Sequence, residues 1–213
     1  APEELDRRFL AALEAETKPL ADTLDDWRTR ITELNKAAAA GRHDEVIRLA
    51  PALRDMFPEY VESGSAYELL VNAYSARGNA AAALAELERY SKAGGRDPGL
   101  IKKLAAELER RNRNKEAAAA LSRLLAVDPL DEELHVRLGG LLLDLGDAAG
   151  AVREYSAALA LKPHDSAAAH FNLARAYRAA NRLDNAREEL LLALETAPGY
   201  RPAQKMLLEL FPN

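Results

Sequence analysis

Residues 132–165 read EELHVRLGGLLLDLGDAAGAVREYSAALALKPHD, and their apolar pattern predicts two helices joined by a turn. Leu138 and Leu142 are four residues apart, so they lie on one face of a first helix. Gly146 then interrupts the apolar pattern, as a turn does. Pro163 ends the stretch, because proline has no amide hydrogen and clashes inside a helix. A second helical stripe lies between the turn and the proline, formed by Ala151, Tyr155, Ala158 and Leu159.

The same pattern recurs along the chain in steps of 34, 34 and 35 residues. Its leucine positions are Leu70, Leu104, Leu138 and Leu173. Its small residues are Ala83, Ala117, Ala151 and Ala186. Two further sets keep the same steps, namely Tyr90, Leu124, Ala158 and Ala193, and Gly95, Pro129, Pro163 and Pro198. A fixed period of this length predicts a stack of helical pairs, each burying its apolar face against its neighbours.

The small residues of the pattern have a physical reason. Where two helices cross closely, only Gly or Ala allows the backbones to approach, and Gly139, Ala151 and Ala158 meet that demand. Leu and Tyr fill the wider gaps.

The unit from Glu132 to Asp165 resembles the tetratricopeptide repeat. The residues that carry the resemblance are Leu138-Gly139, Leu142, Ala151, Tyr155, Ala158 and Pro163. The following unit matches with Leu173-Ala174, Tyr177, Ala186, Leu190, Ala193 and Pro198. The two preceding units match at Leu104-Ala105, Leu108, Ala117, Leu121, Leu124 and Pro129, and at Leu70-Val71, Tyr74, Ala83, Leu87 and Tyr90. The family's early tryptophan is replaced in all four units, by Tyr67, Ile101, His135 and His170.

The resemblance implies an all-α fold, a right-handed α–α superhelix with four clear repeats. We expect these repeats at residues 64–97, 98–131, 132–166 and 167–200. Residues 1–63 are expected to form an N-terminal helix and a degenerate repeat, and residues 201–213 a capping helix that covers the last apolar face.

The degenerate repeat is expected to have a long first helix that begins at about Pro19 and ends near Ala40. Its turn is predicted at Gly41, its second helix carries Val46, Ala50 and Leu53, and Pro58 ends that helix. Trp27, the single tryptophan, is expected in its core, because large aromatic side chains mostly bury area. A separate amphipathic helix with Leu5, Phe9 and Leu13 is predicted before Pro19.

Composition excludes several classes of protein. The chain of 213 residues has a net charge of -5, which does not suit nucleic acid, and no cysteine, which excludes thiol chemistry. No apolar run reaches the length of a membrane span, and no signal peptide is visible. Ala1 stands where Met would begin a gene product, as in a shortened, processed or excised chain. The compartment stays open between a bacterial cytoplasm and the periplasm or secretion, and the Ala- and Arg-rich composition favours a bacterial source.

Catalytic and cofactor motifs were not found in the sequence. The four histidines, His43, His135, His164 and His170, have no zinc-motif spacing. Gly94-Gly95 and Gly139-Gly140 lack the context of a phosphate loop. Acidic pairs such as Glu132-Glu133 lie near helix starts, where they favour the helix dipole. We therefore expect no enzyme activity, no cofactor and no metal.

Ligands of this family usually lie on the concave side, along the first helix of each repeat. The outward positions of those helices give a candidate peptide-binding set of Asn72, Lys102, Lys103, Arg110, Arg137, Asn172, Arg175 and Arg178. Arg can hold carboxylates by paired hydrogen bonds, and Asn can bind the amides of an extended peptide. The family's clamp for C-terminal carboxylates is not matched, because Glu68 and Glu133 occupy two of its positions.

The favoured interpretation is a protein–protein interaction scaffold that binds an acidic protein or an extended peptide in a concave groove. Two alternatives remain: an accessory domain of a larger, secreted bacterial enzyme, and an enzyme in its own right. The sequence decides neither the partner's identity nor the oligomeric state.

Replacing a leucine of the repeat core tests the periodic assignment. Leu138→Ala should lower the free energy of unfolding by about 2–5 kcal/mol, because it removes buried methyl groups and leaves a cavity. Thermal or denaturant unfolding measures the change. A melting curve equal to that of the wild type would contradict the assignment of Leu138 to the core.

Overall fold

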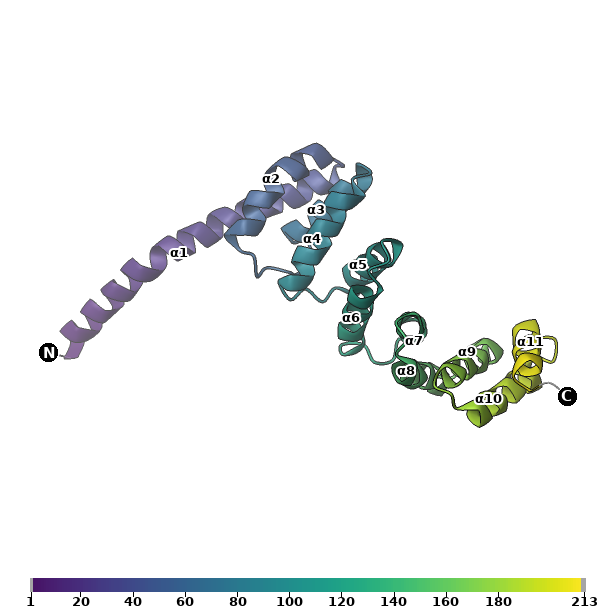
Figure 1. Cartoon of the computed structure of the whole chain (residues 1–213). Coiled ribbons are helices and arrows are strands. Elements are labelled where there is room, and N and C mark those ends of the chain that lie inside the picture. Colours follow the sequence, from purple (N-terminus) through teal and green to yellow (C-terminus); the bar gives the residue numbers. More distant parts are fainter. Residues whose placement is uncertain (1, 212–213) are drawn as a thin grey trace. The chain divides into compact units, whose positions relative to one another are not determined.

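The structure is a computed structural model that describes residues 2–211. These residues form helices joined by short turns and contain no strand. The helices are α1 (Pro2–Ala39), α2 (His43–Met56), α3 (Ala66–Ala76), α4 (Ala80–Lys92), α5 (Pro98–Arg110), α6 (Asn114–Leu125), α7 (Glu132–Asp144), α8 (Ala148–Ala160), α9 (Ser166–Ala179), α10 (Leu183–Thr196) and α11 (Arg201–Leu210) (Figure 1). The expected all-α architecture of consecutive helical pairs is confirmed.

The chain divides into two compact units, residues 1–100 and 101–213, and the division falls inside α5. The boundary after residue 63 stays a prediction from the sequence. Within the first unit, α1, α2 and α3 share one apolar cluster, which joins Trp27 and Ile31 of α1 to Leu53 of α2 and Leu70 of α3. The degenerate N-terminal repeat therefore packs directly on the first helix of the next repeat.

The turns within the helical pairs share one backbone feature. Residues with positive φ occur at Gly41, Gly78, Asn112, Gly146 and Asn181, each just before a second helix. Left-handed backbone costs little for glycine and is tolerated by asparagine, whose short side chain can bond locally. The predicted turns at Gly41 and Gly146 are thus confirmed, and the same conformation closes three further pairs.

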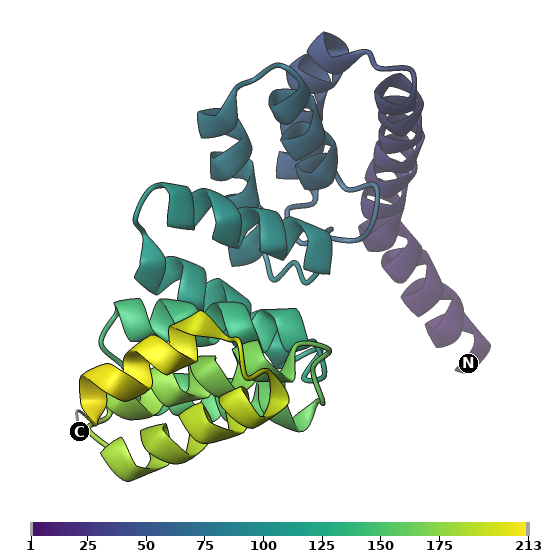
Figure 2. The ribbon, with the colours of Figure 1, turned by 90° about the vertical axis from the view of Figure 1, so that its right-hand side faces the viewer.

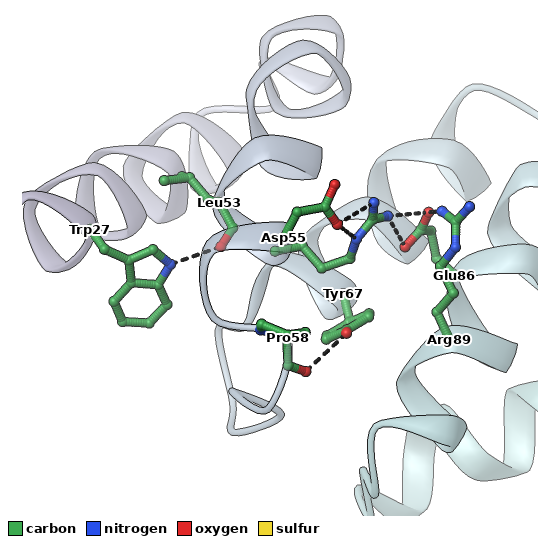
Figure 3. A network of polar contacts seen from close by, with 8 residues as sticks. Trp27, Leu53, Asp55, Pro58, Tyr67, Glu86 and Arg89 are labelled. Carbon is green, nitrogen blue, oxygen red and sulfur yellow. Dashed lines mark hydrogen bonds and ion pairs between the residues drawn. The ribbon is translucent and has the colours of Figure 1, made fainter. Parts of the chain in front are cut away.

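Trp27 lies in the core of the first unit, as predicted, with 5% of its surface exposed. Its indole N–H donates to the carbonyl of Leu53 over 2.9 Å (Figure 3). The rings of Phe57 and Tyr60 pack edge-on against it, with centroids 5.1 and 4.8 Å away. This aromatic cluster fixes the end of α2 on α1.

Close approach explains the glycine at two repeat positions. A Cβ on Gly139 would lie 3.0 Å from the Tyr155 ring, so the predicted need for a small residue there is confirmed. Gly95 occupies the position where the other repeats have proline. A Cβ there would lie 2.2 Å from the Tyr90 ring, and the Tyr90 hydroxyl accepts the amide N–H of Asp97 at 2.8 Å. Tyr90 therefore packs into the space that a proline side chain would fill.

The predicted break at Pro19 is wrong, because α1 runs without interruption from Pro2 to Ala39. Proline removes only one amide donor, the one that would bond to the carbonyl of Ala15. Ala15 and Pro19 are both exposed, so solvent can satisfy that carbonyl. The Thr23 hydroxyl donates to the carbonyl of Pro19 at 2.7 Å. Figures 1 and 2 show this half of α1 extending past the end of α2 within the first unit.

The second unit stacks its helices in order, α7 on α8, α8 on α9 and α9 on α10. Leu138 of α7 is 3% exposed and Leu190 of α10 is fully buried. Helix α11 packs on α10, where Ala203 and Met206 join the apolar cluster of Leu190. It thus covers the end of the stack, as expected of a capping helix.

An ion pair inside the first unit links α2 to α4. The Arg54 guanidinium donates to both oxygens of Glu86 at 2.7 and 2.8 Å, and only 10% and 5% of the two side chains are exposed. Asp55 and Arg89 also contact this pair (Figure 3). A polar network with nearly all of its groups paired holds the two helices in one register.

Breaking this pair should cost far more stability than breaking a surface pair. Glu86→Ala leaves the Arg54 guanidinium buried without its main partner, so we expect a loss of about 3–5 kcal/mol in the free energy of unfolding. The matched control is Glu33→Ala, whose pair with Lys36 is 65% exposed on both sides. That control should cost about 1 kcal/mol or less. Equal losses in denaturant unfolding would contradict the structural role of the buried pair.

Candidate functional site

The second unit has an open hollow of about 390 Å³ between three helices. It is lined by Leu143 and Asp144 of α7, Arg175, Arg178 and Ala179 of α9, and Met206 of α11. Helix α9 turns the two arginines outward because its opposite face, with Leu173, Ala174 and Ala176 among its residues, is buried. Arg175 and Arg178 are three residues apart and both exposed, so they lie side by side on the outer face of the helix.

Arg175 has no acidic partner among the described side chains. Its guanidinium donates only to the side-chain oxygen of Asn172, over 3.4 Å. Arg178 is held by Glu209 of α11 through a loose pair of 3.7 Å, with about half of each side chain exposed. The hollow therefore presents an unpaired positive charge, with Leu143 and Met206 beside it as apolar walls.

The charge of Arg175 reaches the neighbouring tyrosines. Burial raises the pKa of Tyr155 above its ordinary value, and the positive charge of Arg175 acts in the opposite direction. The pKa of Tyr200 is raised by burial as well, and Arg175 again opposes the shift. Both phenols therefore stay protonated and neutral at physiological pH, so the cationic character of the hollow comes from the two arginines.

Two other predicted binding residues are tied to neighbouring helices. Arg137 of α7 contacts Glu109 of α5 at 2.8 Å, with only 25% and 30% of the side chains exposed. Lys102 of α5 contacts Asp131, the N-cap of α7, at 2.8 Å. These two pairs link consecutive first helices of the second unit, so their charges are already neutralised within the fold.

The rest of the predicted set is scattered. Arg110 is exposed and pairs with Glu107 of its own helix. Lys103 is exposed on α5, away from the hollow's lining. Asn72 lies on α3 in the first unit. Of the predicted set, only Arg175 and Arg178 line the hollow, and Asn172 contacts Arg175 from the same helix. The other five lie outside it.

Sequence reasoning missed the acidic and apolar members of the site. Asp144 ends α7, and Met206 comes from the capping helix, which no repeat position could indicate. Leu143 had a usable signal, because it stands 35 residues before Arg178, in the same repeat position.

His135 and His170, which occupy the position of the family's early tryptophan, each form a hydrogen bond with a glutamate of the next helix. His135 bonds to Glu154 at 2.8 Å and to the carbonyl of Pro129 at 3.0 Å. His170 bonds to Glu189 at 2.7 Å. Each pair is separated by 19 residues and joins the first helix of a repeat to the second. The recurring 19-residue spacing was the signal in the sequence for these partners.

Among residues 2–211, no helix combines the length and the apolarity needed to cross a bilayer. The described side chains likewise contain no group of three or more His, Asp or Glu that could hold a metal ion.

Comparison with known proteins places this fold in a class of helical repeat proteins. Two models of the tetratricopeptide repeat match residues 102–166 and 142–210, which together make up about half of the chain. The chain belongs to the tetratricopeptide repeat (TPR) family. A comparison with curated proteins gave no match.

Solved structures agree on the fold. YrrB, described as a TPR protein with an unusual peptide-binding site, is 20% identical with a TM-score of 0.61, and the match covers 89% of this chain and 96% of YrrB. MamA from Desulfovibrio magneticus RS-1, from residue 41 to its end, is 22% identical with a TM-score of 0.56, covering 68% and 81%. A further MamA crystal structure is 20% identical with a TM-score of 0.55, covering 80% and 92%. These likenesses concern the fold alone.

The ion pair between Lys102 and Asp131 predicts that the pKa of Asp131 depends on Lys102. Burial tends to raise the pKa of Asp131, but the Lys102 ammonium and the backbone N–H groups of α7 outweigh it, so this pKa lies below its ordinary value. The stability that Asp131 contributes is present above its unfolded-state pKa and is lost as the pH falls through its folded-state pKa.

Lys102→Met should therefore raise the pKa of Asp131, as followed by carboxyl NMR titration. Lys36→Met on α1 is the control, because Lys36 pairs only with Glu33 at the surface. An Asp131 pKa that stays unchanged in Lys102→Met would show that the ammonium does not hold it down.

Proposed function

We propose that this chain is a non-catalytic interaction scaffold whose second unit binds an extended peptide in the hollow beside α9. The observation that carries the proposal is Arg175, an exposed guanidinium without an acidic partner among the described side chains, which stands next to apolar walls. The peptide-binding character of YrrB, a protein of the same fold, supports this class of function.

The chemistry of the hollow selects a particular kind of peptide. A carboxylate can form two parallel hydrogen bonds with a guanidinium, which fixes its orientation as well as its charge. An apolar side chain next to that carboxylate would contact Leu143 and Met206. Asp144 also lines the hollow, so a second negative charge next to it would be repelled. The preferred ligand is therefore a segment with one acidic group beside an apolar residue.

Lys102 and Arg137, whose charges are neutralised within the fold, have a structural role. Lys102 and Arg137 hold α5 and α7 together, and each would have to leave a carboxylate before it could bind another. Replacing them should reduce stability before it reduces binding. The partner is therefore expected to depend on Arg175 and Arg178, and much less on the other basic residues of the first helices.

Binding to selected peptides tests the proposal. Nine-residue peptides chosen by display on the wild-type chain would be measured by fluorescence anisotropy against wild type, Arg175→Glu and Arg153→Glu. Arg153 is an exposed arginine of α8 outside the hollow, so it receives the same charge change. Arg175→Glu should weaken binding about 10- to 100-fold, because a charged hydrogen bond contributes roughly 1.5–3 kcal/mol.

The affinity of the control variant Arg153→Glu should lie within about twofold of that of the wild type, because salt screens the effect of a distant exposed charge. Affinity should also fall as salt is raised. Peptides that bind equally to wild type and Arg175→Glu would move the site off α9. If display yields no binding peptide at all, the peptide-scaffold proposal fails.

A further inference from the structure

The N-terminal half of α1 carries an apolar stripe that nothing in the described part of the first unit covers. Phe9, Leu10 and Leu13 are 66%, 60% and 44% exposed. The same side chains would be unusual on a helix that had only solvent around it. Single exposed apolar residues are common on protein surfaces, but a row of them on consecutive turns marks a contact surface.

This stripe continues the face that is buried further along the same helix. At 3.6 residues per turn, Phe9 and Leu13 fall in line with Trp27 and Ile31. Trp27 and Ile31 are 5% and 7% exposed because α2 covers them. Helix α2 ends at Met56, next to Trp27, and α1 continues for several turns beyond that point (Figures 1 and 2). One continuous apolar face is therefore half covered.

The helix itself also needs support in this half. Pro19 costs roughly 3 kcal/mol relative to alanine inside a helix. In proteins, most of the stability of a helix comes from packing of its apolar face and not from the propensity of its residues. Every residue before Pro19 whose side chain the structure describes is exposed, so packing against α2, α3 or α4 does not offset that cost. Packing against a further helix would supply the missing stabilisation.

We propose that the N-terminal halves of α1 from two copies of this chain pair antiparallel, with Phe9 of each copy beside Leu13 of the other. The charges on the flank of the stripe favour a second copy as the occupant. In this register the exposed Arg7 of one helix lies next to the exposed Glu14 of the other, and the two-fold axis repeats that pair.

A parallel pair is disfavoured by the same residues. It would hold the basic turn of Arg7 and Arg8 at the same height in both helices, and the Glu14 turns at the same height as well. Like charges at close range destabilise a pair, whereas the antiparallel arrangement brings opposite charges together. A membrane surface is disfavoured too, because residues 2–18 contain five acidic and three basic side chains. Helices that lie on anionic lipid are rich in Lys and Arg.

The expected association is weak and depends on concentration. The paired segment of about 18 residues is roughly 27 Å long, which is short for a stable dimer interface. Sedimentation velocity over a concentration series is therefore the suitable measurement. The wild-type chain should shift from monomer to dimer as its concentration rises. A wild type that stays monomeric would overturn the proposal, including one that binds vesicles of anionic phospholipid instead.

Variants locate the contact. Phe9→Glu/Leu13→Glu should remain monomeric at the highest concentration at which the wild type associates. Leu208→Glu is the control, because Leu208 of α11 is also 66% exposed and lies in the other unit. It should associate like the wild type. Association that persists in the double variant, or that is lost in Leu208→Glu alone, would place the contact elsewhere and overturn the proposal.

A charge exchange tests the direction of the pairing. Arg7→Glu and Glu14→Arg should each weaken dimerisation several-fold, and the combined variant should recover it, because the pair is restored with its signs reversed. If the combined variant dimerises more weakly than either single variant, the antiparallel register is contradicted.

A distance measurement provides an independent check. The chain has no cysteine, so Lys18→Cys gives one spin label per copy. Antiparallel pairing centred near residue 11 should place the two labelled backbones about 20 Å apart, at 1.5 Å of rise per residue. Parallel pairing would leave them about 10 Å apart, the distance between two packed helix axes. The shorter distance would overturn the proposal.

Discussion

Each helical pair in this chain has apolar side chains on more than one side, so no pair can bury them without its neighbours. In the second unit, Ala174 of α9 is fully buried in a cluster that also needs Leu190 of α10 and Met206 of α11. In the first unit, Trp27 depends on the carbonyl of Leu53 and on the rings of Phe57 and Tyr60. Stability is thus shared between adjacent elements.

The same dependence decides which charges are available for binding. Consecutive first helices of the second unit lie close enough for Arg137 to reach Glu109 and for Lys102 to reach Asp131. These ion pairs neutralise two of the cations on the first helices, so neither is available to bind a ligand. Arg175 lies on α9, near the capping helix α11, and its guanidinium pairs with no carboxylate among the described side chains. The end of the stack is therefore the place where an external anion can compete best.

The sequence predicted the repeats well because their pattern is local. A leucine, a small residue and a stop recur at a fixed step, and Gly or Asn closes the turns for a reason that concerns one residue's backbone. Other features depended on which helices touch. Gly95 replaces a proline because the Tyr90 ring fills the space, and Pro19 remains within α1 because the carbonyl that it deprives of a partner is exposed. Neither reason can be read from the residue itself.

In the candidate site, too, periodicity predicted some features and the packing of helices decided the others. The outward position of Arg175 and Arg178 on α9 followed from periodicity, and so did that of Arg137. Periodicity could not show that Glu109 neutralises Arg137, since the partner comes from the preceding repeat. It also could not place Met206, which belongs to the cap. Periodicity gives the face of a helix on which a residue lies, whereas the partner of its charge depends on which helices pack together.

The chain contains only two methionines, and they make a direct test of where a ligand binds. Met206 lines the hollow beside α9, and Met56 packs on the core of the first unit. With methyl-labelled methionine, a bound peptide should shift the NMR signal of Met206 and leave that of Met56 in place. A peptide that binds while the Met206 signal stays unmoved would contradict the assignment of the site to the hollow of the second unit.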